Sequence, residues 1–316
     1  MRSRRISVRL RPHRPSHERH ALLDKLNMFI ALAREEHFGR AADSLGITQP
    51  SLSAGIKQLE QQLGVLLVWR GSRFGGLTPE GQRVLEWARR IVGDVRGMRD
   101  EMRATRHGLA GDVRLAVIPT ALTVASQLTV RFAEAHPNVR FILRSCTSVE
   151  LLSLIENLQA DAGISYLDNE PLGRVTAVPL YREQYHLICG AGHGLAGRQV
   201  IDWGDLSGVP LCLLTPDMQN RRIINHSLHL AGVRPEVTIQ SNSTLALIAH
   251  VEAGPWATVL PRQLSQYLAI GRSLRVIPIR ENRPQHAVGL IAPHREPHTP
   301  ILQALLQMAR AMAEPE

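Results

Sequence analysis

The chain has 316 residues, of which 44% are hydrophobic and 21% charged, and its formal net charge is +9. This length allows two or three compact units with buried cores, and no apolar stretch is long enough to cross a membrane. The three cysteines, an odd number without a C-x-x-C pair, argue against a disulfide framework and against a zinc site. These features exclude membrane-spanning and disulfide-rich secreted proteins, and they predict a cytoplasmic location.

The positive charge is concentrated at the amino-terminal end. Residues 1–20 carry seven arginines against Glu18 and contribute +6, residues 21–110 contribute +3, and residues 111–316 carry equal numbers of both signs. We expect residues 1–20 to form a disordered basic extension, which either adds phosphate contacts or is dispensable. A basic third beside a neutral remainder indicates that one end of the protein meets a polyanion.

Two short helices joined by a turn are predicted after residue 40. The first covers about 40–45 and is stopped by Gly46. The second begins with Thr48 as its cap, followed by a proline in the first turn, where the missing N–H costs nothing. Apolar residues recur along it at spacings of four, three and four, which predicts one inward-facing stripe of Leu52, Ile56, Leu59 and Leu63.

The opposite face of the second helix carries short or amide side chains that can donate to phosphates and base edges. A basic hairpin follows, in which glycines would hold two arginines forward as a wing along the phosphate backbone. The alternative is an ordinary helix pair with a solvated polar face, and the basic hairpin disfavours it. The residues predicted to contact DNA are Gln49, Pro50, Ser51, Ser53, Lys57, Arg70 and Arg73.

Several local motifs of this region resemble one family. They are Leu26–Phe29, the run AA-x-x-L-x-I-T-Q-P-S-L-S that begins at Ala41, Gln58-Leu59-Glu60, Leu63-Gly64, and Leu77-Thr78-Pro79-Glu80-Gly81. Together with the order of segments from Leu22 to the C-terminus, they resemble the LysR-type transcriptional regulators. Two positions depart from the family pattern: Val68 stands where an aromatic residue is common, and Gly55 lies inside the recognition helix. The resemblance implies a winged helix-turn-helix over residues 21–77.

A long helix is predicted over residues 78–107. Its apolar residues recur at spacings of four and three for about three heptads, a narrow stripe that favours pairing with a second helix. A helix packed on its own domain would usually show a broader apolar face. The resemblance implies the same pairing, with a homodimer or homotetramer that sets recognition helices against two DNA half-sites. The predicted dimerisation residues are Val84, Ala88, Ile91, Val95, Met98 and Met102.

Short apolar strands alternate with helices beyond residue 111, which is typical of a parallel sheet covered by helices. We expect one lobe over residues 112–175 and 281–316 and a second lobe over 176–280. The family resemblance implies a two-lobed α/β effector-binding domain like type 2 periplasmic binding proteins. The whole chain is then an α+β multidomain protein.

Ligands of open α/β sheets bind beyond the carboxyl ends of the strands, where helix N-termini favour an anion. Hydroxyl-bearing residues cluster at such positions, although each taken singly is often only a helix cap. By resemblance, Thr120 and Ser148 match effector-contacting positions, and Cys146 stands where glycine is usual. The predicted effector-binding residues are Pro119, Thr120, Thr147, Ser148, Thr215 and Ser243. A small carboxylate or similar anion, from formate size to aromatic-acid size, is the expected co-inducer.

The sequence therefore predicts a transcriptional regulator whose binding to double-stranded DNA is modulated by a small-molecule effector, with no metal or other cofactor and no membrane partner. Two alternatives stay open: a solute-binding module, and a redox-sensing regulator that uses Cys146, Cys189 or Cys212. An enzyme is not expected, because no nucleophile is spaced beside a base. His294 and His298 frame Pro297, which disfavours the helix that an H-x-x-x-H metal site uses.

Overall fold

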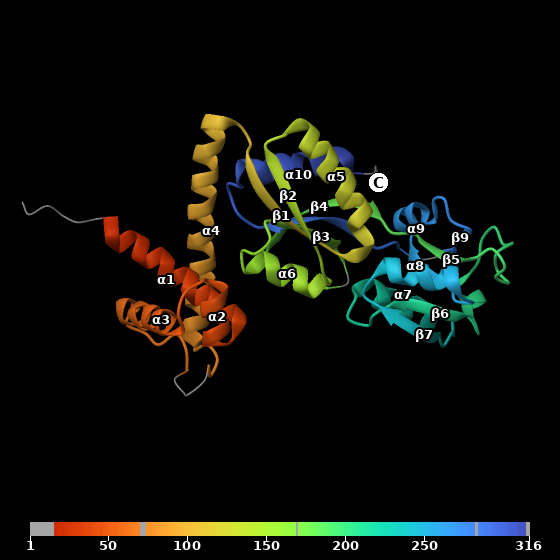
Figure 1. The fold of residues 1–316 in the computed structure, drawn as a ribbon, viewed down its shortest axis with the longest axis horizontal. Coiled ribbons are helices and arrows are strands. Elements are labelled where there is room, and N and C mark those ends of the chain that lie inside the picture. Colours follow the sequence, from red (N-terminus) through yellow and green to blue (C-terminus); the bar gives the residue numbers. More distant parts are fainter. Residues whose placement is uncertain (1–15, 70–73, 169, 282–283, 314–316) are drawn as a thin grey trace, which may run out of the picture. The chain divides into compact units, whose positions relative to one another are not determined.

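The computed structural model describes residues 16–69, 74–168, 170–281 and 284–313, and the chain forms two compact units that divide after Arg96 (Figure 1). The helix α4 (Pro79–His107) begins in the first unit and ends in the second. Within the described residues, no helix combines the length and apolar character that a membrane span requires.

The first unit contains three helices, the base of a β-hairpin and the start of α4. The helices α1 (Ser16–Glu35), α2 (Phe38–Ser44) and α3 (Gln49–Leu63) pack against one another around Phe29 and Leu32, which are fully buried. The helix α1 begins ahead of the domain start predicted at residue 21, so part of the predicted disordered extension is helical. Residues 1–15 of that extension lie outside the described residues.

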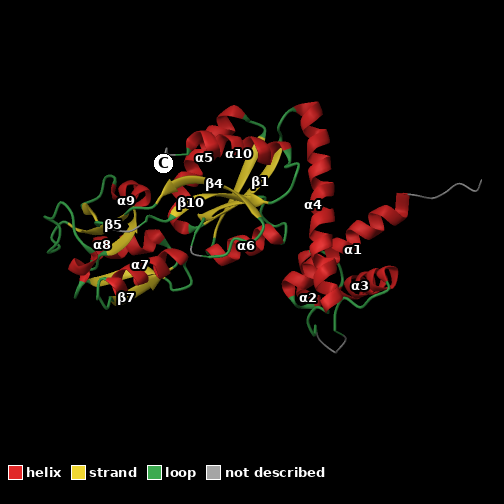
Figure 2. Cartoon of the chain, turned by 180° about the vertical axis from the view of Figure 1, so that it is seen from behind, coloured by secondary structure: helices red, strands yellow, loops and turns green. Residues whose placement is uncertain are grey.

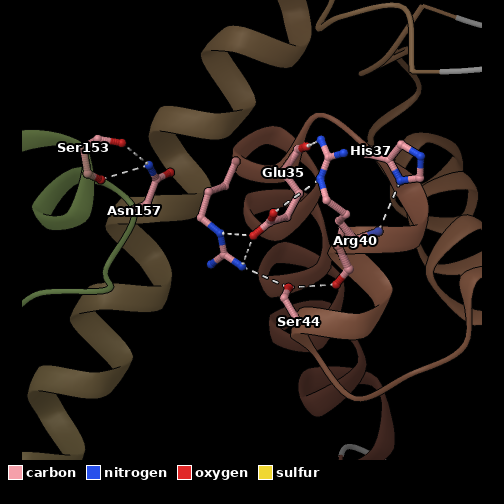
Figure 3. A network of polar contacts seen from close by, with 8 residues as sticks. Glu35, His37, Arg40, Ser44, Ser153 and Asn157 are labelled. Carbon is pink, nitrogen blue, oxygen red and sulfur yellow. Dashed lines mark hydrogen bonds and ion pairs between the residues drawn. The ribbon is translucent and has the colours of Figure 1, made fainter. Parts of the chain in front are cut away.

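Side-chain caps fix the ends of the two shorter helices. The Nδ1 atom of His37 accepts the backbone N–H groups of Gly39 and Arg40 at 3.1 and 3.2 Å, and Arg40 donates to the Glu35 carbonyl oxygen at 2.6 Å (Figure 3). The predicted stop at Gly46 is confirmed, since this residue has a φ of +66°. The predicted cap of α3 is confirmed as well, because Thr48 Oγ1 accepts the N–H of Ser51 at 3.3 Å.

The prediction of an inward-facing apolar stripe on α3 is wrong for one of its four residues. Leu52, Ile56 and Leu59 are buried, but Leu63 has 44% of its surface exposed. Helix α3 ends at Leu63, and Gly64 takes the left-handed conformation with a φ of +70°. The chain turns away there, which leaves the Leu63 side chain exposed in the described part of the chain.

The second unit contains the α/β elements, and its first lobe is a five-stranded sheet. The strand order is β2-β1-β3-β10-β4; β1 runs parallel to β2 and β3, while β10 runs antiparallel to β3 and β4. Helices α5, α6 and α10 pack on this sheet (Figure 1), and Asn157 Nδ2 bonds Ser153 at the end of α6 (Figure 3). The elements are β1 (Gly111–Val117), α5 (Leu122–Ala135), β2 (Val139–Ser145), α6 (Ser148–Glu156), β3 (Ala162–Tyr166), β4 (Val175–Arg182), β10 (Ala287–Pro293) and α10 (Pro300–Met312).

The second lobe has two smaller sheets and three helices, visible together in Figure 2. One sheet has the order β8-β5-β9, with antiparallel pairs, and the other is the parallel pair β6-β7. A bridge between Leu211 and Ala257 joins the two sheets. The elements are β5 (Tyr185–Gly190), β6 (Pro210–Leu214), α7 (Gln219–Leu230), β7 (Glu236–Ser241), α8 (Thr244–Ala253), β8 (Thr258–Pro261), α9 (Arg262–Ala269) and β9 (Leu274–Pro278).

Two features of this unit differ from the prediction. Strand β4, which the sequence places at the start of the second lobe, pairs with β10 and so belongs to the first sheet. That sheet is mixed rather than parallel, because the chain returns from the second lobe antiparallel to β3. Both differences come from the chain crossing twice between lobes, since the returning strand must enter the first sheet from the opposite end.

Candidate functional site

The polar face of α3 is exposed as predicted. Gln49, Pro50, Ser51 and Lys57 are exposed and Ser53 is half-buried, while the buried stripe lies on the other side of the helix. The first of these residues lie on the N-terminal turns, where the positive end of the helix dipole favours contact with phosphate. The face therefore combines donors and a favourable dipole at one end of the helix.

Gly55 lets α3 approach α1 closely. A Cβ atom at this position would lie 2.3 Å from the sulfur of Met28, which is on α1. The atoms that come close to Gly55 therefore belong to the Met28 side chain and not to the backbone of α1. This contact explains a glycine inside a helix, where it costs about 1 kcal/mol relative to alanine.

A buried carboxylate connects α3 to the wing. Glu60 lies near the end of α3, and its Oε1 atom accepts the N–H groups of Leu67 and Val68 at 2.8 and 3.4 Å. The wing is closed at its base by a bridge between Val68 and Leu77 and by the bond from Trp69 N to Gly76 O at 3.0 Å. Arg70 and Arg73, predicted at the tip, lie outside the described residues.

The part of helix α4 in the first unit has a buried apolar face, and a second apolar face of the helix is exposed. Leu85, Ala88 and Val92 are buried, whereas Ile91, Met98 and Met102 are exposed, and Val84 and Val95 are half-buried. Trp87, which the prediction missed, is 59% exposed beside Ile91, one turn earlier on the helix. Its spacing of four from Ile91 was the available sequence signal. The exposed face is thus Trp87, Ile91, Met98 and Met102.

The predicted effector residues of the first lobe lie where β1 and β2 end, at one edge of the sheet. Pro119 and Thr120 are buried, and Thr120 Oγ1 has no hydrogen-bond partner in the part of the chain that the structure describes. Thr147 caps α6 through the N–H of Glu150 at 3.1 Å. Ser148 Oγ donates to the carboxylate of Glu170 at 2.9 Å.

The predicted residues of the second lobe also share an edge. Strands β6 and β7 are parallel, and Thr215 and Ser243 follow them closely in the chain. Thr215 Oγ1 is buried without a partner among the described residues, while Ser243 Oγ accepts the N–H of Ala246 and caps α8. The structure thus forms two pairs of hydroxyl positions, one in each lobe.

Glu170 and Arg222 are site residues that sequence reasoning missed. Glu170 lies in the segment between β3 and β4 of the first lobe, and its carboxylate accepts both Ser148 of α6 and the guanidinium of Arg222 on α7 of the second lobe. A carboxylate is therefore held at the N-terminus of α6, where the dipole stabilises negative charge. No motif signals this arrangement, because its three residues are far apart in the sequence.

All three cysteines are buried thiols. Burial raises the pKa of Cys146 and of Cys212 to about 11, and it also raises the pKa of Cys189. Because the thiolate is the reactive form, these environments suppress reactivity. Within the described residues, no group of three or more His, Cys, Asp or Glu side chains is placed to hold a metal ion.

Comparison with known proteins places both units in one family. Residues 23–82 match the lysR family of bacterial regulatory helix-turn-helix proteins, and residues 106–314 match the LysR substrate binding domain. The helix-turn-helix match excludes the alternative of a solute-binding module, which would explain only the second unit.

The relatives whose role is described are transcriptional regulators and not enzymes. The chain is 30% identical over 268 residues to the "Probable hydrogen peroxide-inducible genes activator" of Mycobacterium avium, covering 84% of this chain and 86% of the relative. It is 29% identical over 245 residues to the HTH-type transcriptional regulator XapR of Escherichia coli strain K12, covering 77% and 83%. A full-length OxyR variant of Pseudomonas aeruginosa has a similar structure, with a TM-score of 0.68, 26% identity and coverage of 91% and 94%. The chain therefore belongs to the LysR family of DNA-binding transcriptional regulators with an effector-binding domain.

Proposed function

We propose that two copies of α3 enter two half-sites of a promoter while the wing arginines contact the phosphate backbone. The observation that carries this proposal is the capped α3 with its exposed face of Gln49, Ser51 and Lys57. Short and amide side chains at the start of a helix suit contacts to base edges and phosphates in the major groove. Arg70 and Arg73 extend these contacts along the backbone.

The exposed face of α4 supports pairing of this chain with a second copy. Trp87, Ile91, Met98 and Met102 are large apolar side chains, all exposed in the single chain. Burying such side chains against a partner helix stabilises a dimer by removing apolar surface from water. A pair of α4 helices would set two recognition helices at a fixed separation, and a homotetramer would add two more.

Replacing Arg70 and Arg73 by alanine is expected to weaken binding to specific and non-specific DNA alike. Each arginine that neutralises a phosphate contributes about 0.9 to the slope of log affinity against log salt, so the slope should fall by about 2. A gel-shift titration over a range of salt concentrations, on DNA from immediately upstream of the gene, measures it. The control replaces Arg131 and Arg198, which are exposed in the second unit. An unchanged slope in the R70A/R73A variant would refute the wing contact.

A small carboxylate is the proposed effector, bound between the two lobes. The support is that the N-terminus of α6 and Arg222 already hold the carboxylate of Glu170. A diffusible carboxylate would compete with Glu170 for these contacts. It would also accept hydrogen bonds from the hydroxyls of Thr120 and Thr215, which have no partner in the described structure. An effector that prefers one closure of the lobes shifts the population of conformations, and with it DNA binding.

Formate, acetate and benzoate, added singly in calorimetric titrations, test this effector site. We expect at least one of them to bind, and Arg222→Ala to weaken that binding about tenfold or more, because a hydrogen-bonded charge contact of roughly 1.5–3 kcal/mol is lost. Arg272→Ala serves as the control, since Arg272 pairs with Glu252 outside this site. Equal affinities of the R222A variant and the unmodified chain would contradict the assignment.

Peroxide sensing by cysteine is the second candidate, because several relatives are named as hydrogen peroxide-inducible genes activators. The buried thiols with raised pKa values disfavour it. We expect brief peroxide treatment to leave DNA binding unchanged and Cys146, Cys189 and Cys212 unmodified by mass spectrometry. The same treatment in urea should modify them. Oxidation of the folded chain with altered DNA binding, abolished by one Cys→Ser substitution, would reverse this conclusion.

A further inference from the structure

A cavity of about 330 Å³ lies beside the two segments that connect the lobes. Glu183 lies on the outward crossing between β4 and β5, Glu281 and His286 lie on the return toward β10, and Asp168 follows β3 in the first lobe. The crossings are joined by a hydrogen bond from Glu183 N to His286 O at 2.8 Å. None of the six predicted effector residues lines this cavity, which makes it a site separate from the proposed carboxylate site.

Glu183 is one of the residues that line the cavity, and its side chain carries the main argument for a ligand. Its side chain is buried, with 1% of the residue exposed, and its Oε2 atom accepts the hydroxyls of Tyr166 and Tyr185, both at 2.7 Å. The other oxygen, Oε1, has no hydrogen-bond partner among the described residues. A buried carboxylate oxygen without a partner is costly, so a donor from a ligand in the cavity would satisfy it.

The lining of the cavity selects for a positively charged ligand. Three carboxylates contribute to it, those of Asp168, Glu183 and Glu281, against the two imidazoles of His226 and His286. Asp168 and Glu281 have partners, since Asp168 pairs with His286 at 3.3 Å and Glu281 accepts Trp203 Nε1 at 3.2 Å. Among the carboxylate oxygens of this lining, Glu183 Oε1 is the one that is buried without a partner in the described structure.

The size and apolar part of the wall point to an organic ligand. The volume is in the range of small-molecule sites and is larger than a bare ion requires. Tyr185 and Ile223 supply apolar surface beside the acidic groups. We propose that this cavity binds a small organic cation, whose ammonium or guanidinium N–H group donates to Glu183 Oε1 while its short apolar portion packs on Tyr185 and Ile223.

Binding there would act on the angle between the lobes. Glu183 lies between β4 of the first lobe and β5 of the second, and its partners Tyr166 and Tyr185 come one from each lobe. Asn220 of α7 donates to the Tyr166 hydroxyl at 3.2 Å and extends the cluster into the second lobe. A cation bound to Glu183 would therefore favour one arrangement of the crossings. This regulatory consequence rests on the proposed function, whereas binding itself does not.

Calorimetric titration of the full chain at pH 8 with n-butylammonium and n-butylguanidinium tests the site. At this pH the Glu183 carboxyl is ionised, because burial raises its pKa only to about 7. We expect at least one cation to bind saturably, while butanoate and butanol of the same chain length do not bind at the cavity. Glu183→Gln keeps the shape of the side chain and removes its charge, so the affinity for the cation should fall at least tenfold.

A second variant keeps the test decisive if Glu183→Gln misfolds. Glu281→Gln is expected to weaken cation binding by a smaller factor than Glu183→Gln. Glu252 pairs with Arg272 outside the cavity, so Glu252→Gln should leave cation binding unchanged. Trp203 provides a local signal, because its indole N–H bonds Glu281; a change of tryptophan emission on binding should disappear in Trp203→Phe.

Absence of binding by both cations, or binding that persists equally in the E183Q and E281Q variants, would overturn the proposal. Failure of DNA binding would not produce either result, so the two proposals are tested separately. If the cations bind but leave the gel-shift pattern unchanged, the site stands and its regulatory role is overturned.

Discussion

Gly81→Ala is expected to destabilise the DNA-binding unit and to abolish DNA binding at temperatures where the unmodified chain is active. A Cβ atom on Gly81 would lie 2.1 Å from the carbonyl oxygen of Leu67 and 3.0 Å from its carbon. These are backbone atoms of the strand that leads into the wing, and Leu67 O also accepts Thr78 N at 3.0 Å. The helix and the strand would have to separate, which breaks this bond.

The expected net loss of unfolding free energy is about 2 kcal/mol. Overpacking against backbone costs roughly 3 kcal/mol, while alanine gains about 1 kcal/mol over glycine in a helix. Urea denaturation of the full chain, followed by circular dichroism and paired with gel-shift assays, measures the loss.

Gly55→Ala is the matched control for this substitution, in the same unit and also inside a helix. There the added Cβ meets the sulfur of the half-buried Met28, near the end of a flexible side chain that can move aside. We expect the unfolding free energy to change by less than about 1 kcal/mol. If G81A and G55A are equally stable, the wing strand does not constrain Gly81 as described.

Glu183→Gln is expected to change the pH dependence of stability more than any other carboxyl substitution in the described chain. Burial raises the pKa of Glu183 from 4.5 to about 7, although the hydroxyls of Tyr185 and Tyr166 stabilise the carboxylate; Asp168 nearby raises it further. The folded state therefore holds a proton that the unfolded state has lost. Stability from this group is fully present below pH 4.5 and is lost as the pH rises through 7.

The free energy that corresponds to this change of pKa is about 3 kcal/mol. The unfolding free energy of the unmodified chain, minus that of E183Q, should thus fall by about 3 kcal/mol between pH 4.5 and pH 8. Other titrating groups are common to both proteins and cancel in the difference. Among them is His186, whose pKa burial lowers to about 4.

Glu252→Gln is the control for the pH experiment, because Glu252 lies in a partly exposed pair with Arg272. Its stability difference from the unmodified chain should stay nearly constant over the same range of pH. A constant difference for E183Q as well would mean that Glu183 is not buried as a neutral acid at low pH.

Local sequence signals predicted most elements of the fold. Gly46 follows the end of α2 and Thr48 caps α3, both as predicted, because a capping hydroxyl and a glycine with positive φ act within a few residues.

The candidate sites were predictable only in part. The exposed face of α3 follows from the position of its buried stripe, so its residues are found from the sequence. Glu170, Arg222 and Glu183 are not, because their roles depend on partners brought together from separate elements. Trp87 was predictable in part: its helical spacing from Ile91 can be read from the sequence, but its exposure cannot.

The sequence by itself determined most of the helices and strands, where the basic charge lies, and which family motifs the chain carries. These properties depend on neighbours within a few positions, for which periodicity and caps suffice. Only the tertiary structure decided that β4 joins the first sheet, that Leu63 is exposed, and that Glu183 is buried beside a cavity. Strand pairing, burial and the pKa of a carboxyl depend on residues distant in the chain, and the fold alone brings those residues together.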